Sequence, residues 1–170
     1  MTKAYVLLKC KNGAEDYVLS NLRALDSVVR ARGVLGVYDI VAIVRAESED
    51  ALKDIVTKKI RKIPKITGTY TLITDDKSRL EKQIPGKDVL ETYLSEAHIL
   101  IDCETGREAT VLSSLREIPE VVSADVLMQS RQIMCSIMAP TYDMITLIVI
   151  KKIRKIPYIT GTTTLHSIGK

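Results

Sequence analysis

The sequence predicts an α+β protein made of two copies of one βαββαβ unit in tandem. Three observations predict this class. The chain repeats itself at a fixed spacing, each copy alternates strand-like and helix-like segments in the same order, and the strand-like segments are apolar at nearly every position. A chain of 170 residues is long enough for two small domains.

The repeat is clearest in a segment of 15 residues near the end of each copy. Residues 58–72 return as residues 151–165, identical at 13 of the 15 positions and 93 residues further along the chain. The same spacing, without a gap, pairs Cys10 with Cys103. A match of this extent does not arise by chance, so the two copies share one fold.

Each copy begins with a strand, a helix and a hairpin. In the first copy, residues 4–10 form an apolar run of strand length, and residues 12–13 contain a glycine turn. Apolar residues then recur at helical spacing, at Val18, Leu19, Leu22 and Leu25. Residues 27–34 and 40–44 are two further apolar runs, which predict a hairpin.

A second helix and a closing strand complete the unit. The apolar residues of this helix fall on one stripe, at Leu52, Ile55, Val56, Ile60 and Ile63. Pro64 marks its end, because the residue before a proline disfavours the α region. Residues 69–73 are rich in β-branched side chains and form the closing strand. The resulting order, βαββαβ, is the ferredoxin-like unit.

The strand composition predicts how the two units pack. Residues 6–8 and 40–44 are apolar at nearly every position, although the helices of such a unit cover only one face of its sheet. Continuous hydrophobicity indicates a sheet that is buried on both faces. We therefore expect the two units to pack sheet-to-sheet as a fused pseudo-dimer.

The distribution of polar and apolar residues along the chain predicts the domain boundaries and the cellular location. We expect the first unit over residues 1–74, a polar linker over 75–94 and the second unit over 95–170. No signal-peptide segment precedes the first strand and no apolar run approaches the ~18 residues of a membrane span, so we predict a cytoplasmic protein. The three cysteines include no CxxC pair, which favours reduced, core-filling thiols. We predict no metal and no cofactor.

Two stretches resemble a known family. Residues 36–39 form a Gly-x-Tyr-Asp loop before the third strand, and residues 63–71 read Ile-Pro-Lys-Ile-Thr-Gly-Thr-Tyr-Thr. Together they resemble the effector domain of the Lrp/AsnC (feast/famine) transcription regulators, also called the RAM domain. The family pattern has a glycine after the proline, where this chain has Lys65 and, in the second copy, Tyr158. The resemblance covers both copies.

The resemblance implies an assembling, ligand-binding module. Members of the family form sheet-on-sheet dimers, many stack into higher oligomers, and they bind amino acids or related small molecules between dimers. Most carry an N-terminal helix-turn-helix domain, whereas here residues 1–3 precede the first strand, so we expect a stand-alone tandem form. The implied partners are a small-molecule effector such as an amino acid, further copies of the chain, and Lrp/AsnC-type helix-turn-helix regulators.

The candidate ligand site is the loop between the second and third strands together with the closing strand. Glycines expose backbone N–H groups that suit a ligand carboxylate. Asp39 is placed to accept a hydrogen bond from a ligand ammonium group, and Tyr38 to supply an amphipathic wall. The predicted ligand-binding residues are Gly33, Leu35, Gly36, Tyr38, Asp39, Thr69 and Thr71. The alternative is a hairpin turn with a solvated aspartate.

The second copy has lost this loop chemistry. The positions that match Gly33, Gly36, Tyr38 and Asp39 hold Val126, Gln129, Arg131 and Gln132. Both glycines and the acid are gone, and Arg131 is either an anion ligand or a surface charge. We expect at most one competent site per chain, in the first copy.

Three further functions compete with ligand binding. The basic runs at residues 58–62 and 151–155 could hold nucleic acid, but they fall in the last turns of helices, where cations complement the helix dipole. We therefore expect neither DNA binding nor membrane contact. His98 near Cys103 invites a metal or thiol site, yet no P-loop, GxSxG or HExxH motif occurs, and we predict that the chain is not an enzyme. The remaining rival is a ligand-free interaction scaffold.

Overall fold

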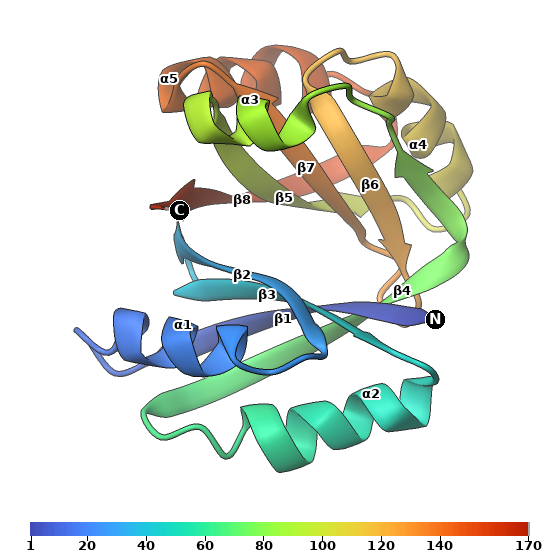
Figure 1. Ribbon diagram of the computed structural model, residues 1–170. Helices are drawn as coiled ribbons and strands as arrows, with labels where there is room; N and C mark the ends of the chain where they lie inside the picture. The colour runs from blue at the N-terminus through green and yellow to red at the C-terminus, as the bar shows by residue number, and fades with distance from the viewer. Residues whose placement is uncertain (170) are drawn as a thin grey trace. The chain divides into compact units, whose positions relative to one another are not determined.

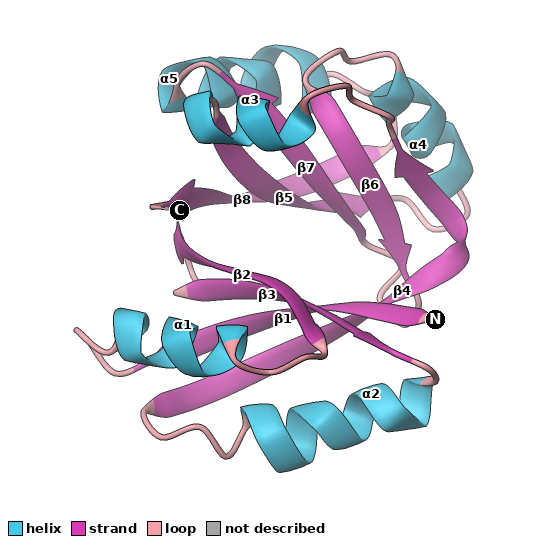
Figure 2. Cartoon of the chain, in the orientation of Figure 1, coloured by secondary structure: helices cyan, strands magenta, loops and turns pink. Residues whose placement is uncertain are grey.

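The computed structural model describes residues 1–169 and divides into two compact units. Unit 1 consists of Met1–Asp76 and the chain's end from Ile168, and unit 2 consists of Lys77–Ser167. Figure 1 follows the chain through both units, and Figure 2 shows that strands and helices alternate in each. The predicted fold class of two tandem ferredoxin-like βαββαβ units is confirmed, whereas their sheet-to-sheet packing stays a prediction.

Unit 1 has its elements in the predicted order. They are β1 (Thr2–Cys10), α1 (Glu15–Arg23), β2 (Val28–Leu35), β3 (Ile40–Ala46), α2 (Glu49–Ile55) with a π-helical continuation η1 (Val56–Ile60), and β4 (Ile66–Glu81). The strands pair antiparallel in the order β4-β1-β3-β2. The side chain of Ser48 caps α2 by accepting a hydrogen bond of 3.1 Å from the N–H of Ala51.

Both faces of the unit 1 sheet are buried. Ala4, Val6 and Leu8 lie in one apolar cluster with the buried residues of both helices. Tyr5 and Leu7, which alternate with them, are also buried but point to the opposite face. This confirms the burial on both faces that the continuous hydrophobicity of the strand predicts.

Unit 2 repeats this arrangement. Its elements are β5 (Ser95–Cys103), α4 (Glu108–Arg116), β6 (Val121–Leu127), β7 (Ile133–Ala139), α5 (Tyr142–Ile148) with η2 (Val149–Ile153), and β8 (Ile159–Ile168). The strand order is β8-β5-β7-β6. Even the register irregularity near the end of β1, between Lys9 and Cys10, recurs in β5 between Asp102 and Cys103.

The segment predicted as a linker, residues 75–94, contains regular structure. β4 continues to Glu81, and Leu80 packs into the apolar core of unit 2. The backbone N–H of Lys82 then donates to the carbonyl of Val122. A short helix, α3 (Lys87–Tyr93), leads into β5. Within residues 1–169, no helix has the length and apolarity needed to cross a lipid bilayer.

The residue after the proline that both copies share, Pro64 or Pro157, has a left-handed backbone. Lys65 has φ 75° and Tyr158 has φ 74°. In both units the carbonyl of this residue accepts a hydrogen bond of 2.9 Å, from the N–H of Lys11 in unit 1 and of Glu104 in unit 2. A glycine adopts this conformation without a steric penalty, which gives a physical reason for a glycine at this position in the Lrp/AsnC pattern.

Candidate functional site in the first unit

The loop between β2 and β3 is held at both ends by backbone hydrogen bonds. The N–H of Val34 donates to the carbonyl of Asp39, and the N–H of Asp39 donates to the carbonyl of Leu8, each at 2.9 Å. Gly36, at the tip, has φ 149°, a conformation that is open almost only to glycine. The loop therefore has a defined shape next to the end of β1.

Asp39 joins this loop to the irregular end of β1. Its Oδ2 atom accepts a hydrogen bond of 3.0 Å from the backbone N–H of Cys10. The register of β1 and β4 shifts between Lys9 and Cys10, so this N–H lies where the regular ladder is interrupted. Burial, together with the nearby carboxylates of Asp39 and Glu15, raises the pKa of the Cys10 thiol. The Cys10 thiol is therefore biased toward its protonated form, and the Cys10 backbone contacts the loop.

A cation stands beside the aromatic ring of the loop. The Nζ atom of Lys9 lies 5.7 Å from the centroid of the Tyr38 ring, within the range of a cation–π contact. Sequence reasoning missed Lys9. The signal was present in the repeat, because the matching residue of the second copy is Asp102, a reversal of charge. The end of β1 thus carries a positive group, Lys9, which contacts Tyr38, and its next residue, Cys10, is bound by the negative group of Asp39.

The remaining loop residues have different surroundings. The side chains of Leu35 and Val37 are each 59% exposed and extend the loop surface with apolar groups. Gly33 is buried instead, and a Cβ atom added to it would lie 3.1 Å from Cγ1 of Ile168. A side chain at position 33 would therefore press on Ile168, and Gly36 is the glycine that the loop exposes.

The two predicted threonines lie apart from this loop. Thr69 pairs with Leu8 and Thr71 with Val6, so both point to the helix-covered face of the sheet. The Oγ1 atom of Thr69 accepts a hydrogen bond of 2.8 Å from Nε of Arg61. The Oγ1 atom of Thr71 is buried without a hydrogen-bond partner.

Strand order separates the threonines from the loop. Two strand spacings of ~4.8 Å, about 10 Å, separate β4 from the start of β3, where Asp39 lies, and three spacings separate β4 from β2. The structure therefore brings together Gly36, Tyr38 and Asp39 with Lys9. It does not bring Thr69 or Thr71 to the same place.

Unit 2 has different chemistry at the matching position. Nε2 of Gln132, which replaces Asp39, donates to Oδ1 of Asp102 at 2.6 Å. Nε of Arg131, which replaces Tyr38, lies 3.4 Å from Oε1 of Glu108. Hydrogen bonds from the backbone N–H groups of Glu108 and Gly106, with the Arg131 charge, hold the pKa of the Glu108 carboxyl below its usual value against the opposing effect of burial. The positive charge of Arg131 therefore already has a carboxylate beside it.

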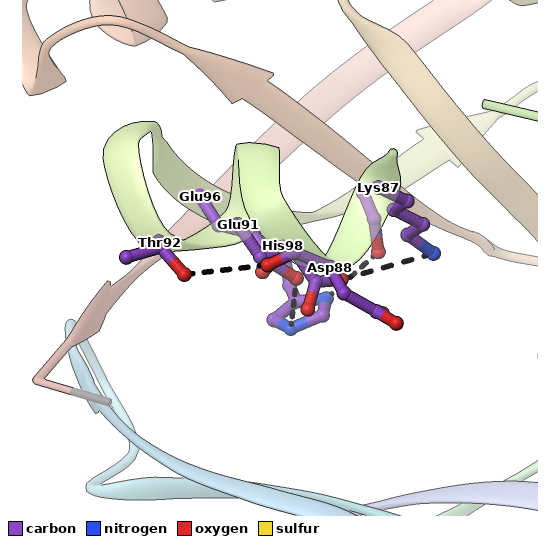
Figure 3. Close-up of polar contacts among 7 residues, drawn as sticks. Lys87, Asp88, Glu91, Thr92, Glu96 and His98 are labelled. Atoms are coloured by element: carbon purple, nitrogen blue, oxygen red, sulfur yellow. Dashed lines mark hydrogen bonds and ion pairs between the residues drawn. The ribbon is translucent and has the colours of Figure 1, made fainter. Parts of the chain in front are cut away.

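A second polar cluster lies in unit 2, and sequence reasoning missed it. Nδ1 of His98 lies 2.9 Å from Oγ of Ser136, and Nε2 of His98 lies 3.6 Å from Oε1 of Glu96. The side chains of Glu96 and His98 are each only 4% exposed. Figure 3 draws the contact between Glu96 and His98 together with polar side chains of α3. An imidazole with a carboxylate near one ring nitrogen and a hydroxyl near the other can pass a proton between them. Glu96 and His98 alternate with apolar residues along β5, and this pattern is the sequence signal that indicates the cluster.

The three cysteines lie in different surroundings within residues 1–169. His98 lies within hydrogen-bond distance of Ser136, and within residues 1–169 no three His, Cys, Asp or Glu side chains gather to hold a metal ion. Burial, together with the charges of Glu108 and Asp102, raises the pKa of the Cys103 thiol. Complete burial raises the pKa of Cys135 to about 12. All three thiols are thus biased toward the protonated, unreactive form.

Unit 1 is a ferredoxin-like domain with a charged, glycine-containing loop at one end of its sheet. Comparison with known proteins identifies the family to which it is similar. The family model described as Lrp/AsnC ligand binding domain matches residues 3–76. FFRP-DM1 is 35% identical, with 44% of this chain and 100% of that chain covered (TM-score 0.43). Hypothetical protein PHS023 from Pyrococcus horikoshii is 35% identical, with 44% and 90% covered (TM-score 0.43). The chain therefore belongs to the Lrp/AsnC family, with its ligand-binding domain in residues 3–76. The comparison with curated proteins finds no match.

A whole-chain likeness corrects one prediction. Siroheme decarboxylase NirDL shares the fold over 98% of this chain and 71% of its own, with a TM-score of 0.76 and 10% identity. The prediction that the chain is not an enzyme is therefore wrong, because this architecture is that of a named enzyme. That prediction relied on missing linear motifs, whereas catalytic groups can come from separate strands of a fold. At 10% identity the likeness shows the fold alone.

Proposed function

We propose that unit 1 is the ligand-binding part of a regulatory module and that it binds an amino acid or a related zwitterion at the β2–β3 loop. The observation that carries the proposal is the pair of opposite charges at one end of β1, where Lys9 contacts the Tyr38 ring and Asp39 binds the N–H of Cys10. An amino acid carries the complementary pair on adjacent atoms. The match to the Lrp/AsnC ligand-binding domain supports a small molecule as the ligand.

Each group of the ligand has a counterpart in this loop. A carboxylate has two oxygens, and Asp39 uses Oδ2 for the Cys10 N–H, so Oδ1 accepts from the ligand ammonium group. The Lys9 ammonium group, with the backbone of Gly36, receives the ligand carboxylate. The ring of Tyr38 and the exposed side chain of Leu35 pack against the ligand side chain. Thr69 and Thr71 have no direct role in this arrangement.

Unit 2 serves as a built-in comparison. Its matching residues are Asp102, Arg131 and Gln132, and each already contacts another residue of unit 2. A zwitterion placed there would meet Asp102 where Lys9 offers a cation in unit 1. We therefore propose one ligand site per chain.

The ligand-binding module would act through partner proteins. We propose that the chain acts in the cytoplasm, assembles with further copies of itself, and modulates transcription through helix-turn-helix regulators of the Lrp/AsnC type. The family membership supports this role. The basic helix ends are weaker support for this role, because some of their cations form ion pairs within the chain. Lys58 lies 3.6 Å from Asp54, and Lys152 lies 2.9 Å from Glu120.

A thermal-shift screen of the full chain against the twenty amino acids tests the binding proposal. A ligand present at 100 times its Kd raises stability by roughly 2.7 kcal/mol, a shift of several degrees. Asp39→Asn keeps an acceptor for the Cys10 N–H but removes the charge, and we expect it to weaken binding about 10- to 100-fold. Asp102→Asn makes the same charge change in unit 2 and serves as the matched control, with binding unchanged. Equal losses in the two variants would contradict the site.

A further inference from the structure

The second helix of unit 2 exposes apolar side chains that its counterpart in unit 1 does not have. Met144, Leu147 and Ile150 lie on the continuous helix formed by α5 and η2 and are 44%, 49% and 48% exposed. They are spaced three residues apart, so they follow one another along one side of the helix. The buried side of this helix, by contrast, packs into the unit 2 core through Ile145, Ile148, Val149 and Ile153.

The repeat supplies an internal control for this stripe. The matching residues of unit 1 are Ala51, Asp54 and Thr57, and Asp54 forms an ion pair with Lys58 at 3.6 Å. On the buried side, the matching residues stay apolar in both units. The two helices therefore share their inward face and differ selectively on the outward one. Solvent does not favour a change from small or polar to large apolar residues, whereas burial against a partner does.

We propose that this stripe, defined as Met144, Leu147 and Ile150, is the contact surface between two copies of the chain, paired antiparallel about a two-fold axis through Leu147. The inference rests on the self-association in the proposed function and gives that self-association a surface. The occupant is identified by the charges that flank the stripe.

The flanking charges are opposite in sign and equally distant from Leu147. Asp143 lies four residues before it and Lys151 four residues after it, and both are exposed. Residues four apart share one side of a helix, so both charges border the stripe. In an antiparallel pair, Asp143 of one copy faces Lys151 of the other, twice over, and Met144 faces Ile150. A two-fold interface requires such a self-complementary pattern.

Sedimentation velocity of the full chain over a concentration series tests the interface. We expect a reversible dimer for the wild-type chain. Leu147→Asp places in unit 2 the residue that unit 1 has at Asp54, and we expect it to shift the equilibrium to monomer by at least tenfold in concentration. Thr146→Asp changes an exposed residue beside the stripe and serves as the control that leaves the dimer intact. Circular-dichroism melting verifies that both variants are folded.

Charge exchange tests the antiparallel geometry. Asp143→Lys and Lys151→Asp, each alone, place like charges opposite one another and weaken the dimer, and the double variant restores it. A monomeric wild-type chain at all concentrations, or a dimer insensitive to Leu147→Asp, would overturn the inference. Failure of the double variant to restore dimerisation would overturn the two-fold pairing. Titration of the Leu147→Asp monomer with amino acids separates the two proposals, because loss of the interface alone leaves the Asp39 site intact.

Discussion

The carboxylate of Asp39 accepts a hydrogen bond of 3.0 Å from the backbone N–H of Cys10, and so ties the β2–β3 loop to the irregular end of β1. The same side chain is the anionic group of the proposed site. Its structural and its binding contribution can be separated, because an asparagine retains the acceptor and loses only the charge.

Asp39→Ala should therefore destabilise the protein more than Asp39→Asn. The alanine leaves the part-buried Cys10 N–H without its acceptor, at a cost of about 1–3 kcal/mol. The asparagine should cost less than about 1 kcal/mol, since a neutral hydrogen bond replaces a charge-assisted one. Urea unfolding of the two variants measures the difference. Equal stabilities would show that the hydrogen bond contributes nothing to the fold.

The Lys65→Gly variant should be more stable to unfolding than the Lys65→Ala variant. Both substitutions remove the contact of Lys65 Nζ with the Tyr17 ring, which lies 4.7 Å away. Only glycine relieves the left-handed backbone of φ 75°, so Lys65→Gly should exceed Lys65→Ala in unfolding free energy by about 1 kcal/mol. Tyr158, with φ 74°, should behave in the same way. Chemical denaturation of the two pairs measures this, and an alanine variant as stable as its glycine partner would contradict it.

Alkaline stability should depend on Cys135. Burial raises the pKa of its thiol from 9.0 in the unfolded chain to about 12 in the fold. A group whose folded-state pKa is raised stabilises fully below its unfolded pKa, and that contribution is lost as the pH rises from 9 towards 12.

The free energy of unfolding should accordingly fall by about 1.4 kcal/mol per pH unit from this group over that interval. Cys135→Ala lowers the whole curve through the small cavity it leaves, but it should remove this part of the slope. Urea unfolding at successive pH values gives the two slopes. Parallel curves for the wild type and the variant would refute the assignment.

The contact between His98 and Ser136 should be measurable as stability. Ser136→Ala removes the hydroxyl that lies 2.9 Å from Nδ1 of His98 in a buried setting, and we expect a loss of about 1–3 kcal/mol. Ser130→Ala, an exposed position in the neighbouring turn, is the control and should change stability by less than about 0.5 kcal/mol. Equal effects of the two substitutions would mean that the buried contact is not stabilising.

Much of the fold could be predicted because its signals are local or repeated. The identical segments at residues 58–72 and 151–165 require one fold for both copies. The unbroken apolar run through Tyr5, Val6 and Leu7 correctly indicates a strand that is buried on both faces. The regular structure within residues 75–94 has weaker signals, because a single apolar residue, Leu80, anchors the end of β4 in a polar stretch.

The candidate site was harder to predict because strand order is not local. Thr69 and Asp39 are both close to Leu8 in the sheet, but Thr69 pairs with Leu8 on the helix-covered face, whereas Asp39 meets only its backbone carbonyl. Lys9 escaped notice because it sits within an otherwise apolar strand, and only comparison with Asp102 marks it. The cluster of Glu96, His98 and Ser136 depends on the pairing of β5 with β7, which no linear motif records.

The central claim is that one amino-acid site exists per chain and that it lies at the β2–β3 loop of unit 1. Isothermal titration of the full chain with the amino acid selected by thermal shift measures the number of sites directly. We predict one site per chain, lost on charge reversal in Lys9→Glu and unaffected by Arg131→Ala. Two equivalent sites per chain, or binding that survives Lys9→Glu, would contradict the account.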